Sequence, residues 1–152
     1  MTQIPLFQPP SEWTPPEDIP NLSDAKEIAV DLETYDPNLK TNGPGWAINN
    51  GYVAGVSIAV EGWKGYFPIR HEGGGNFDEA IFKRQLQKIM NLPCDKIFHN
   101  ASYDVGWLRW WGIEVKGKII DTLIAAPLID ENRFRYSLNE LGKDYLKDTK
   151  SE

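Results

Sequence analysis

The chain has 152 residues and a formal net charge of -6, and 41% of its residues are hydrophobic, which is enough to build the core of one domain. The acidic balance excludes nucleic-acid binding that depends on overall positive charge, but it is compatible with a metal-dependent enzyme. The single cysteine, Cys94, excludes an intramolecular disulfide and a cysteine-based zinc cluster. Without a secretory pattern or a membrane-length apolar run, we expect a cytoplasmic protein.

The predicted elements begin after a proline-rich segment. Residues 1–20 contain six prolines, which block helix formation and strand pairing, so we expect an extended arm there and one domain over residues 21–152. Short apolar runs between turn residues predict strands, at 27–33, 52–60, 63–69, 96–99 and 118–120. Apolar residues at helical spacing predict helices, at 77–90, 102–111, 122–129 and 138–146. The stretch 36–51, which holds two prolines and three glycines, is predicted to be a loop.

The order of these elements predicts a mixed α/β fold. Three consecutive strands with short connections favour an antiparallel meander, whereas strands that alternate with helices favour parallel crossovers. We therefore expect a five-stranded sheet, with three antiparallel strands followed by parallel strands, that is flanked by helices.

Two acids lie at the end of the first predicted strand. Asp31 and Glu33 alternate with Leu32, so both carboxylates point to one face of the strand while Leu32 anchors the other. Carboxylate oxygens are ligands that Mg²⁺ prefers. An Asp-x-Glu pair also fits a solvated strand end, and this alternative stays open for the pair taken alone.

A second polar group follows the fourth predicted strand. Asn100 comes at its carboxyl end, where α/β sheets bind ligands, and Asp104 comes one helical turn later. The two side chains can therefore face the same cleft. Capping of the helix by Asn100 or Ser102 is the structural alternative, and it is compatible with catalysis.

Three ordered pieces of the chain carry a resemblance to a known family. Val30-Asp-Leu-Glu-Thr34 and His99-Asn-Ala-Ser-Tyr-Asp-Val105 resemble the first two exonuclease motifs of the proofreading domain of family A DNA polymerases, within the DnaQ-like, ribonuclease-H-fold superfamily. Asp121-Thr-Leu-Ile-Ala-Ala-Pro-Leu-Ile-Asp130, followed by Tyr136-Ser-Leu-Asn-Glu-Leu141, is similar to the next segment of bacteriophage-type members. The resemblance implies a ribonuclease-H-like sheet in a bacterial or phage-infected cell, with a polymerase domain in the intact protein.

The implied activity is 3′→5′ removal of nucleotides from single-stranded DNA ends with two divalent ions, Mg²⁺ or Mn²⁺. By the same resemblance, Asp31 would bridge both ions, Glu33 would bind the ion that holds the attacking water, and Asp104 would hold the second ion. Asp121 is placed outside this metal-binding set, because a helix cap or another role in the fold suits it better.

Substrate contacts are predicted from six further residues. The resemblance implies that Leu32 and Thr34 line the terminal nucleotide and that Asn100 and Tyr103 contact the substrate. The loop after Glu33 adds two aromatic candidates for stacking on bases, for which anchoring of the loop is the alternative, namely Tyr35 and Trp46.

The third exonuclease motif of the family, a Tyr or His followed four residues later by Asp, has no good match. Tyr145 and Asp148 are three residues apart, and Tyr136 has Glu140 at the right spacing instead of Asp. We therefore expect a truncated form that lacks the C-terminal helices and has impaired activity. Self-association through the uncovered C-terminal face is a further expectation.

Two other functions stay open on sequence alone. The fold could serve as a non-catalytic nucleic-acid-binding or scaffolding module, or it could act as an exoribonuclease on RNA 3′ ends. Metal-dependent digestion of labelled DNA, its loss in Asp31→Ala, and a comparison with RNA would separate these functions.

Overall fold

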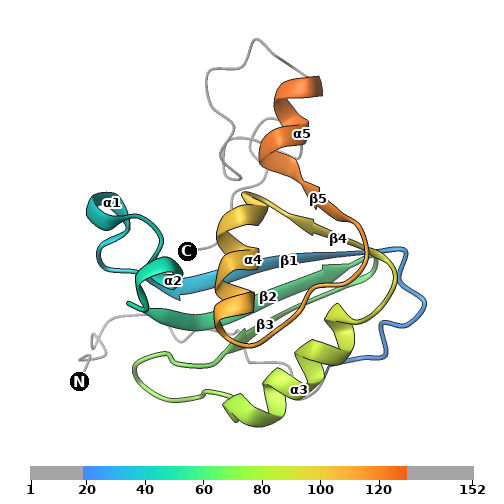
Figure 1. Cartoon of the computed structure of the whole chain (residues 1–152). Helices are drawn as coiled ribbons and strands as arrows, with labels where there is room; N and C mark the ends of the chain where they lie inside the picture. Colours follow the sequence, from blue (N-terminus) through green and yellow to red (C-terminus); the bar gives the residue numbers. More distant parts are fainter. Residues whose placement is uncertain (1–18, 130–152) are drawn as a thin grey trace, which may run out of the picture.

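All five predicted strands form one sheet in the computed structural model, which describes residues 19–129 (Figure 1). The strands are β1 (Glu27–Tyr35), β2 (Tyr52–Val60), β3 (Trp63–Pro68), β4 (Asp95–Phe98) and β5 (Ile119–Asp121). The helices are α1 (Leu39–Asn42), α2 (Gly45–Ile48), α3 (Glu79–Met90), α4 (Ala101–Trp110) and α5 (Thr122–Ile129). Each predicted strand and helix in this range is present, with ends that differ by at most two residues.

The strands lie in the order β3-β2-β1-β4-β5. β1 pairs antiparallel with β2 and β2 pairs antiparallel with β3, whereas β1 with β4 and β4 with β5 are parallel. The prediction of three antiparallel strands followed by parallel ones is confirmed. Because β1 and β4 run in the same direction, their carboxyl ends meet at one edge of the sheet, where α/β proteins place their sites.

The prediction of a plain loop over 36–51 is wrong in two places, because this stretch contains α1 and α2. The Asp36 carboxylate accepts a hydrogen bond from the backbone N–H of Gly45 at 3.0 Å, and Asn50 N–H donates to the Gly45 carbonyl at 2.9 Å. A side chain at Gly45 would lie 1.8 Å from the Asn50 carbonyl, so the short turn requires glycine.

Several predictions fall outside the described residues. These are the arm up to residue 18, the helix at 138–146 and the weak third-motif candidates, Tyr136, Glu140, Tyr145 and Asp148. Within residues 19–129, none of the helices has the length and apolar character that a membrane crossing requires.

One face of the sheet packs against two helices. Leu32, Val56 and Phe67 lie side by side across β1, β2 and β3, and each is at least 94% buried. The Phe67 ring packs on Phe82 of α3 at 5.2 Å, and Phe82 packs on Trp111 at the end of α4 at 6.3 Å. Since strand side chains alternate, the residues between these core positions point to the opposite face.

Lys96 at the start of β4 is fully buried, and its Nζ donates to three backbone carbonyls, those of Leu92, Cys94 and Lys116. Burial lowers the pKa of Lys96. We expect Lys96→Met to lower the free energy of unfolding by about 2–4 kcal/mol, because the three carbonyls lose their donor. Relief of the buried charge offsets part of this loss.

Urea unfolding followed by circular dichroism measures the effect of Lys96→Met. The matched control is Lys64→Met on β3, where the lysine is exposed and a change within about 0.5 kcal/mol is expected. Equal stability of the two variants would show that the carbonyl contacts contribute nothing beyond the cost of burying the ammonium group.

Candidate active site

The two acids of β1 lie on the face of the sheet that is opposite to the helix-packed core. Asp31 pairs with Ser57 of β2 and Glu33 pairs with Gly55, and both acids are half-buried. The register shifts directly after Glu33, because the next pair is Thr34 with Val53 and Ala54 is left over as a bulge. Bulges bend a strand and re-aim its side chains. This one lies directly after Glu33, two residues before β1 ends at Tyr35.

A hydrogen-bonded link ties the end of β1 to the first turn of α4. The Tyr103 hydroxyl donates to the Asp36 carboxylate at 2.8 Å and lies 2.9 Å from the Thr34 hydroxyl. Burial raises the pKa of Tyr103, so the phenol keeps the proton that it donates to Asp36. The Thr34 hydroxyl is then left to donate to the Tyr103 oxygen. This link fixes the residue that follows Tyr103, which is Asp104, relative to β1.

Asp104 is 4% exposed in the first turn of α4. Within residues 19–129, no three histidine, cysteine, aspartate or glutamate side chains lie close enough together to form the ligand set of one metal ion. The register of β1 places Asp31 and Glu33 on one face, as the alternation predicts, whereas the participation of Asp104 stays a prediction. The oxygen donors of all three residues suit a hard cation such as Mg²⁺.

Asn100 and Asp121 have clear structural roles. Asn100 precedes α4 with a left-handed backbone (φ 67°), a conformation that asparagine tolerates better than most residues. Its side chain makes no cap hydrogen bond to the helix. Instead, the Asp121 carboxylate accepts from the backbone N–H groups of Asn100 and Ala101 at 2.9 Å and of Leu123 at 3.0 Å. Capping of α4 by Asn100 or Ser102 is thus replaced by capping from β5.

The other predicted substrate contacts differ in exposure. Leu32 is 6% exposed and belongs to the core, whereas Tyr35 is 53% exposed and stacks on Tyr52 at 5.1 Å. Thr34 and Tyr103 are half-buried and hydrogen-bonded to each other. Tyr35 is therefore the candidate whose ring is most available to a nucleotide base.

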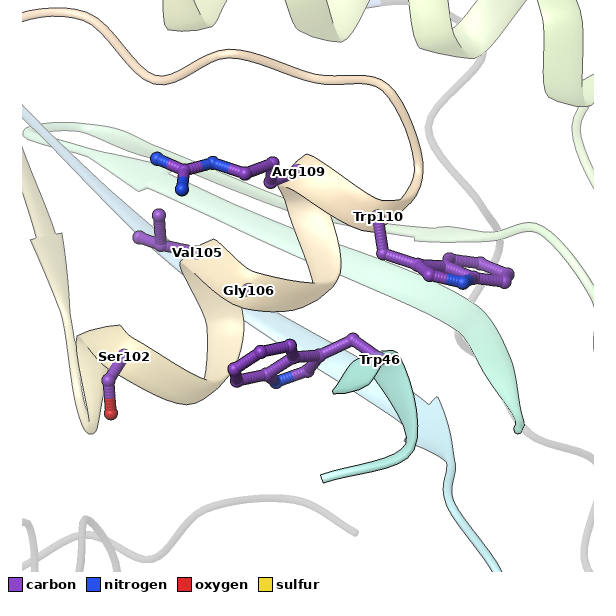
Figure 2. A pocket seen from close by; sticks show the side chains of 6 residues that line it. All are labelled: Trp46, Ser102, Val105, Gly106, Arg109 and Trp110. Carbon is purple, nitrogen blue, oxygen red and sulfur yellow. The ribbon is translucent and has the colours of Figure 1, made fainter. Parts of the chain in front are cut away.

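Trp46 anchors α2 against α4 (Figure 2). A side chain at Gly106 would lie 2.4 Å from the Trp46 indole, so the two helices approach closely because α4 has glycine at this position. The indole also lines an open pocket of about 330 Å³ with five residues of α4, namely Ser102, Val105, Gly106, Arg109 and Trp110. The contacts of Trp46 thus agree with anchoring of the loop, which was the alternative to base stacking. Asp31, Glu33 and Asp104 do not line this pocket.

Sequence reasoning missed Tyr66 and gave no role to His71. Tyr66 of β3 pairs with Ser57, which pairs with Asp31, so the three side chains share one face. Burial, and after it the negative charges of Glu33 and Asp31, raise the pKa of Tyr66 to about 12. The Tyr66 hydroxyl also forms a hydrogen bond with His71 Nε2. The tight turn at 61–62 indicates that Tyr66 lies opposite Ser57, because the turn sets the register of β2 with β3.

Comparisons with known proteins agree with this architecture. The family described as 3′-5′ exonuclease matches residues 14–152. A DNA-directed DNA polymerase of Pseudomonas phage M6 is 38% identical over 149 residues, which cover 93% of this chain and 22% of that polymerase. DNA polymerase I of Synechocystis sp. is 29% identical over 124 residues, which cover 78% of this chain and 11% of that protein.

Two solved structures share the fold. NrnC of Brucella melitensis with bound Mg²⁺ is 21% identical with a TM-score of 0.60, and the match covers 88% of this chain and 60% of that one. RNase D of Escherichia coli, an exoribonuclease involved in structured RNA processing, is 18% identical with a TM-score of 0.58, covering 86% and 30%. At these identities the likeness concerns the ribonuclease-H-like fold alone.

The chain spans less than a quarter of the phage polymerase that it matches, so the comparison concerns one domain of a larger protein. The family match nevertheless extends over nearly the whole chain. It includes the strand with Asp31 and Glu33 and the helix with Asp104. The chain therefore belongs to the family of 3′-5′ exonuclease domains found in DNA polymerase I-like proteins.

Proposed function

We propose that this domain removes nucleotides one at a time from the 3′ end of single-stranded DNA, with divalent ions held by Asp31, Glu33 and Asp104. The observation that carries the proposal is the position of the first two acids. They lie on one face of β1, and the hydrogen bonds among Thr34, Tyr103 and Asp36 join the end of this strand to α4.

The carboxylate oxygens of these residues are of the chemical type that binds hard divalent ions. Asp31 and Glu33 offer carboxylate oxygens from neighbouring same-face positions, and their combined negative charge contributes to the raised pKa of Tyr66. Such a concentration of negative charge is stabilised by a bound cation. Two bound ions would supply electrostatic stabilisation of the attacking and leaving oxygens during phosphodiester hydrolysis.

The chain's own residues would orient the substrate. Tyr35 exposes its ring next to the acids along β1, where a base at the 3′ end can stack on it. Thr34 and Tyr103 join the end of β1 to α4, which limits movement of the strand that carries Asp31 and Glu33 relative to the helix that carries Asp104. We further propose that the domain works beside a polymerase domain, as in the phage relative.

A polarity assay tests this function. We expect the purified chain with Mn²⁺ to release the label of a 3′-labelled single strand at once as a mononucleotide, while a 5′-labelled strand shortens stepwise. EDTA should stop both reactions, because the carboxylates alone cannot balance the charge that develops on the phosphate. Internal cuts would contradict an exonuclease, and equal or faster digestion of an RNA strand would favour the exoribonuclease alternative.

A further inference from the structure

A row of three side chains crosses the sheet and begins at Asp31, the first residue of the acidic pair. Asp31 of β1, Ser57 of β2 and Tyr66 of β3 are register partners, so they project from the same face. In the next row, Glu33 pairs with Gly55. Tyr66 thus reaches the acidic strand from two strands away, across a serine and a glycine.

Gly55 leaves room for the Tyr66 ring to lie toward Glu33. A side-chain carbon at residue 55 would lie 2.0 Å from the Tyr66 hydroxyl oxygen and 2.5 Å from the ring carbon that bears it. The hydroxyl therefore sits directly over Gly55, the register partner of Glu33. Any larger residue at this position would displace the phenol from the acid.

The segment after β3 holds His71 against the Tyr66 hydroxyl. The N–H groups of Ile69 and Arg70 both donate to the carbonyl of Ala54, the bulged residue beside Glu33, at 2.8 and 3.0 Å. His71 is then fixed by Asn76, because its N–H donates to Asn76 Oδ1 at 2.7 Å and its carbonyl accepts from Asn76 Nδ2 at 2.9 Å.

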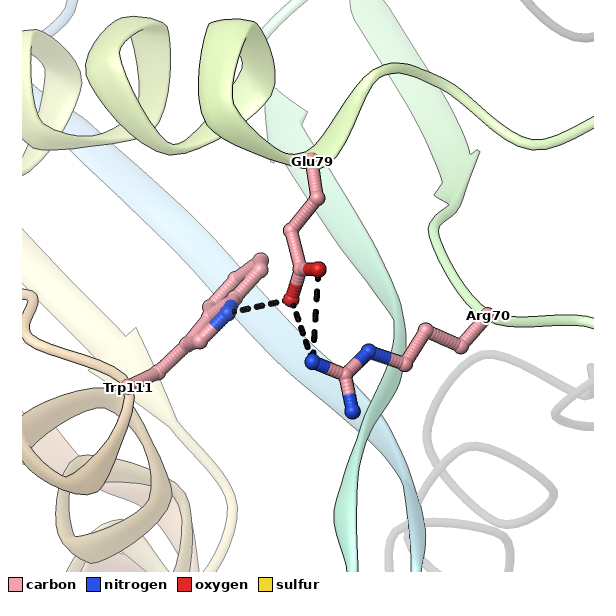
Figure 3. Close-up of polar contacts among 3 residues, drawn as sticks. All are labelled: Arg70, Glu79 and Trp111. Carbon is pink, nitrogen blue, oxygen red and sulfur yellow. Dashed lines mark hydrogen bonds and ion pairs between the residues drawn. The ribbon is translucent and has the colours of Figure 1, made fainter.

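A second anchor secures the same segment to the helices (Figure 3). The Arg70 guanidinium donates to both carboxylate oxygens of Glu79 at 3.0 and 3.2 Å, and Trp111 Nε1 donates to one of them at 2.9 Å. The end of β3, the first turn of α3 and the end of α4 therefore meet at Glu79. His71 is the next residue after Arg70, which these contacts hold in place.

We propose that Tyr66 and His71 form a positioning pair for the Glu33 carboxylate, in which His71 orients the Tyr66 hydroxyl and the hydroxyl restrains Glu33. When His71 carries its proton on Nε2, the ring donates to the Tyr66 oxygen, and the Tyr66 hydroxyl can donate its own hydrogen to the carboxylate. Groups behind a metal-binding carboxylate fix its orientation in this way. This inference rests on the proposed exonuclease function and adds two positioning residues to it.

Four single variants, one double variant and one control test the pair. Tyr66→Phe removes the hydroxyl and keeps the ring, and Gly55→Ala displaces the ring. His71→Ala removes the orienting group, whereas His71→Gln restores a donor near the Nε2 position. Lys64→Ala is the control, because Lys64 is an exposed residue on the same face of β3 whose register partner is Ala59, away from the acids.

We expect Tyr66→Phe, Gly55→Ala and His71→Ala each to lower kcat on single-stranded DNA by roughly 10- to 100-fold, with KM changed by less than about twofold. His71→Gln should recover most of the rate. The Tyr66→Phe/His71→Ala double variant should be no slower than either single variant, because the two residues act as one unit. Titration with Mn²⁺ followed by electron paramagnetic resonance should show roughly 10-fold weaker binding in Tyr66→Phe.

The outcomes separate this inference from the function on which it rests. An active chain whose kcat and Mn²⁺ affinity are unchanged by Tyr66→Phe would overturn the pair and leave the exonuclease function intact. The pair would also be overturned if the losses of kcat in the two single variants multiplied in the double variant. A loss of kcat that follows a falling Tm and is not recovered by His71→Gln would overturn it as well. An unaltered chain that neither digests DNA nor binds Mn²⁺ would overturn the function, and the pair with it.

Discussion

Asp31→Asn is expected to lower the rate of DNA digestion by roughly 10³-fold or more, because catalytic groups that act as a unit fail together when one is removed. The substitution keeps the size of the side chain and removes its charge. Asp31 lies on the same face of the sheet as Glu33, Ser57 and Tyr66. Initial rates on a 3′-labelled single strand, at saturating DNA and Mn²⁺, measure the effect.

Asp31→Asn should leave the fold intact. Asp31 is only half-buried and asparagine keeps the shape of its side chain, so the Tm of the variant should stay within about 2 °C of that of the unaltered chain. Asp24→Asn, at a site before β1, is the matched control and should keep full activity. A variant at Asp31 that retains its rate would remove this residue from the catalytic set.

Asp121→Ala is expected to lower the free energy of unfolding by about 3–5 kcal/mol, because three backbone N–H groups lose a charged acceptor. For a domain of this size the loss corresponds to a fall in Tm of about 10 °C. Thermal unfolding followed by circular dichroism measures it. The cap joins Asp121, the last residue of β5, to Ala101, the first residue of α4, which lies 20 residues earlier in the chain.

Asp121→Asn provides the graded comparison. An asparagine retains the acceptor for Asn100 and Leu123 and loses the charge and the bond to Ala101, so a fall of about 1–2 kcal/mol is expected. At a temperature where it is folded, Asp121→Asn should digest DNA at close to the unaltered rate, unlike Asp31→Asn. A loss of activity without a loss of stability would make Asp121 a ligand instead of a cap.

The strand and helix order could be predicted from sequence because it depends on local patterns. Glu61 and Gly62 mark a tight turn, and the runs on either side alternate, so the pairing of β2 with β3 follows from the chain itself. Asp31 and Glu33 were found for the same reason, because a period of two places both on one face.

Long-range register could not be predicted in the same way. The pairing of Asp31 with Ser57 spans the stretch 36–51, in which the Asp36 carboxylate accepts from the N–H of Gly45 at the start of α2. A shift of one residue in the pairing of β1 with β2 would have placed Tyr66 and Asp31 on opposite faces of the sheet. The proximity of Tyr66 to the acids is therefore a property of the assembled sheet, as is the cap that Asp121 provides to α4.

Binding of Mn²⁺ shows whether the face of β1 that carries Asp31 and Glu33 holds the divalent ions of an exonuclease. We would measure it by electron paramagnetic resonance on the unaltered chain and on the Asp31→Asn/Glu33→Gln double variant. We expect saturable binding to the unaltered chain and a loss of at least roughly 10-fold in affinity for the folded double variant. Equal Mn²⁺ affinity of the two proteins would contradict this expectation.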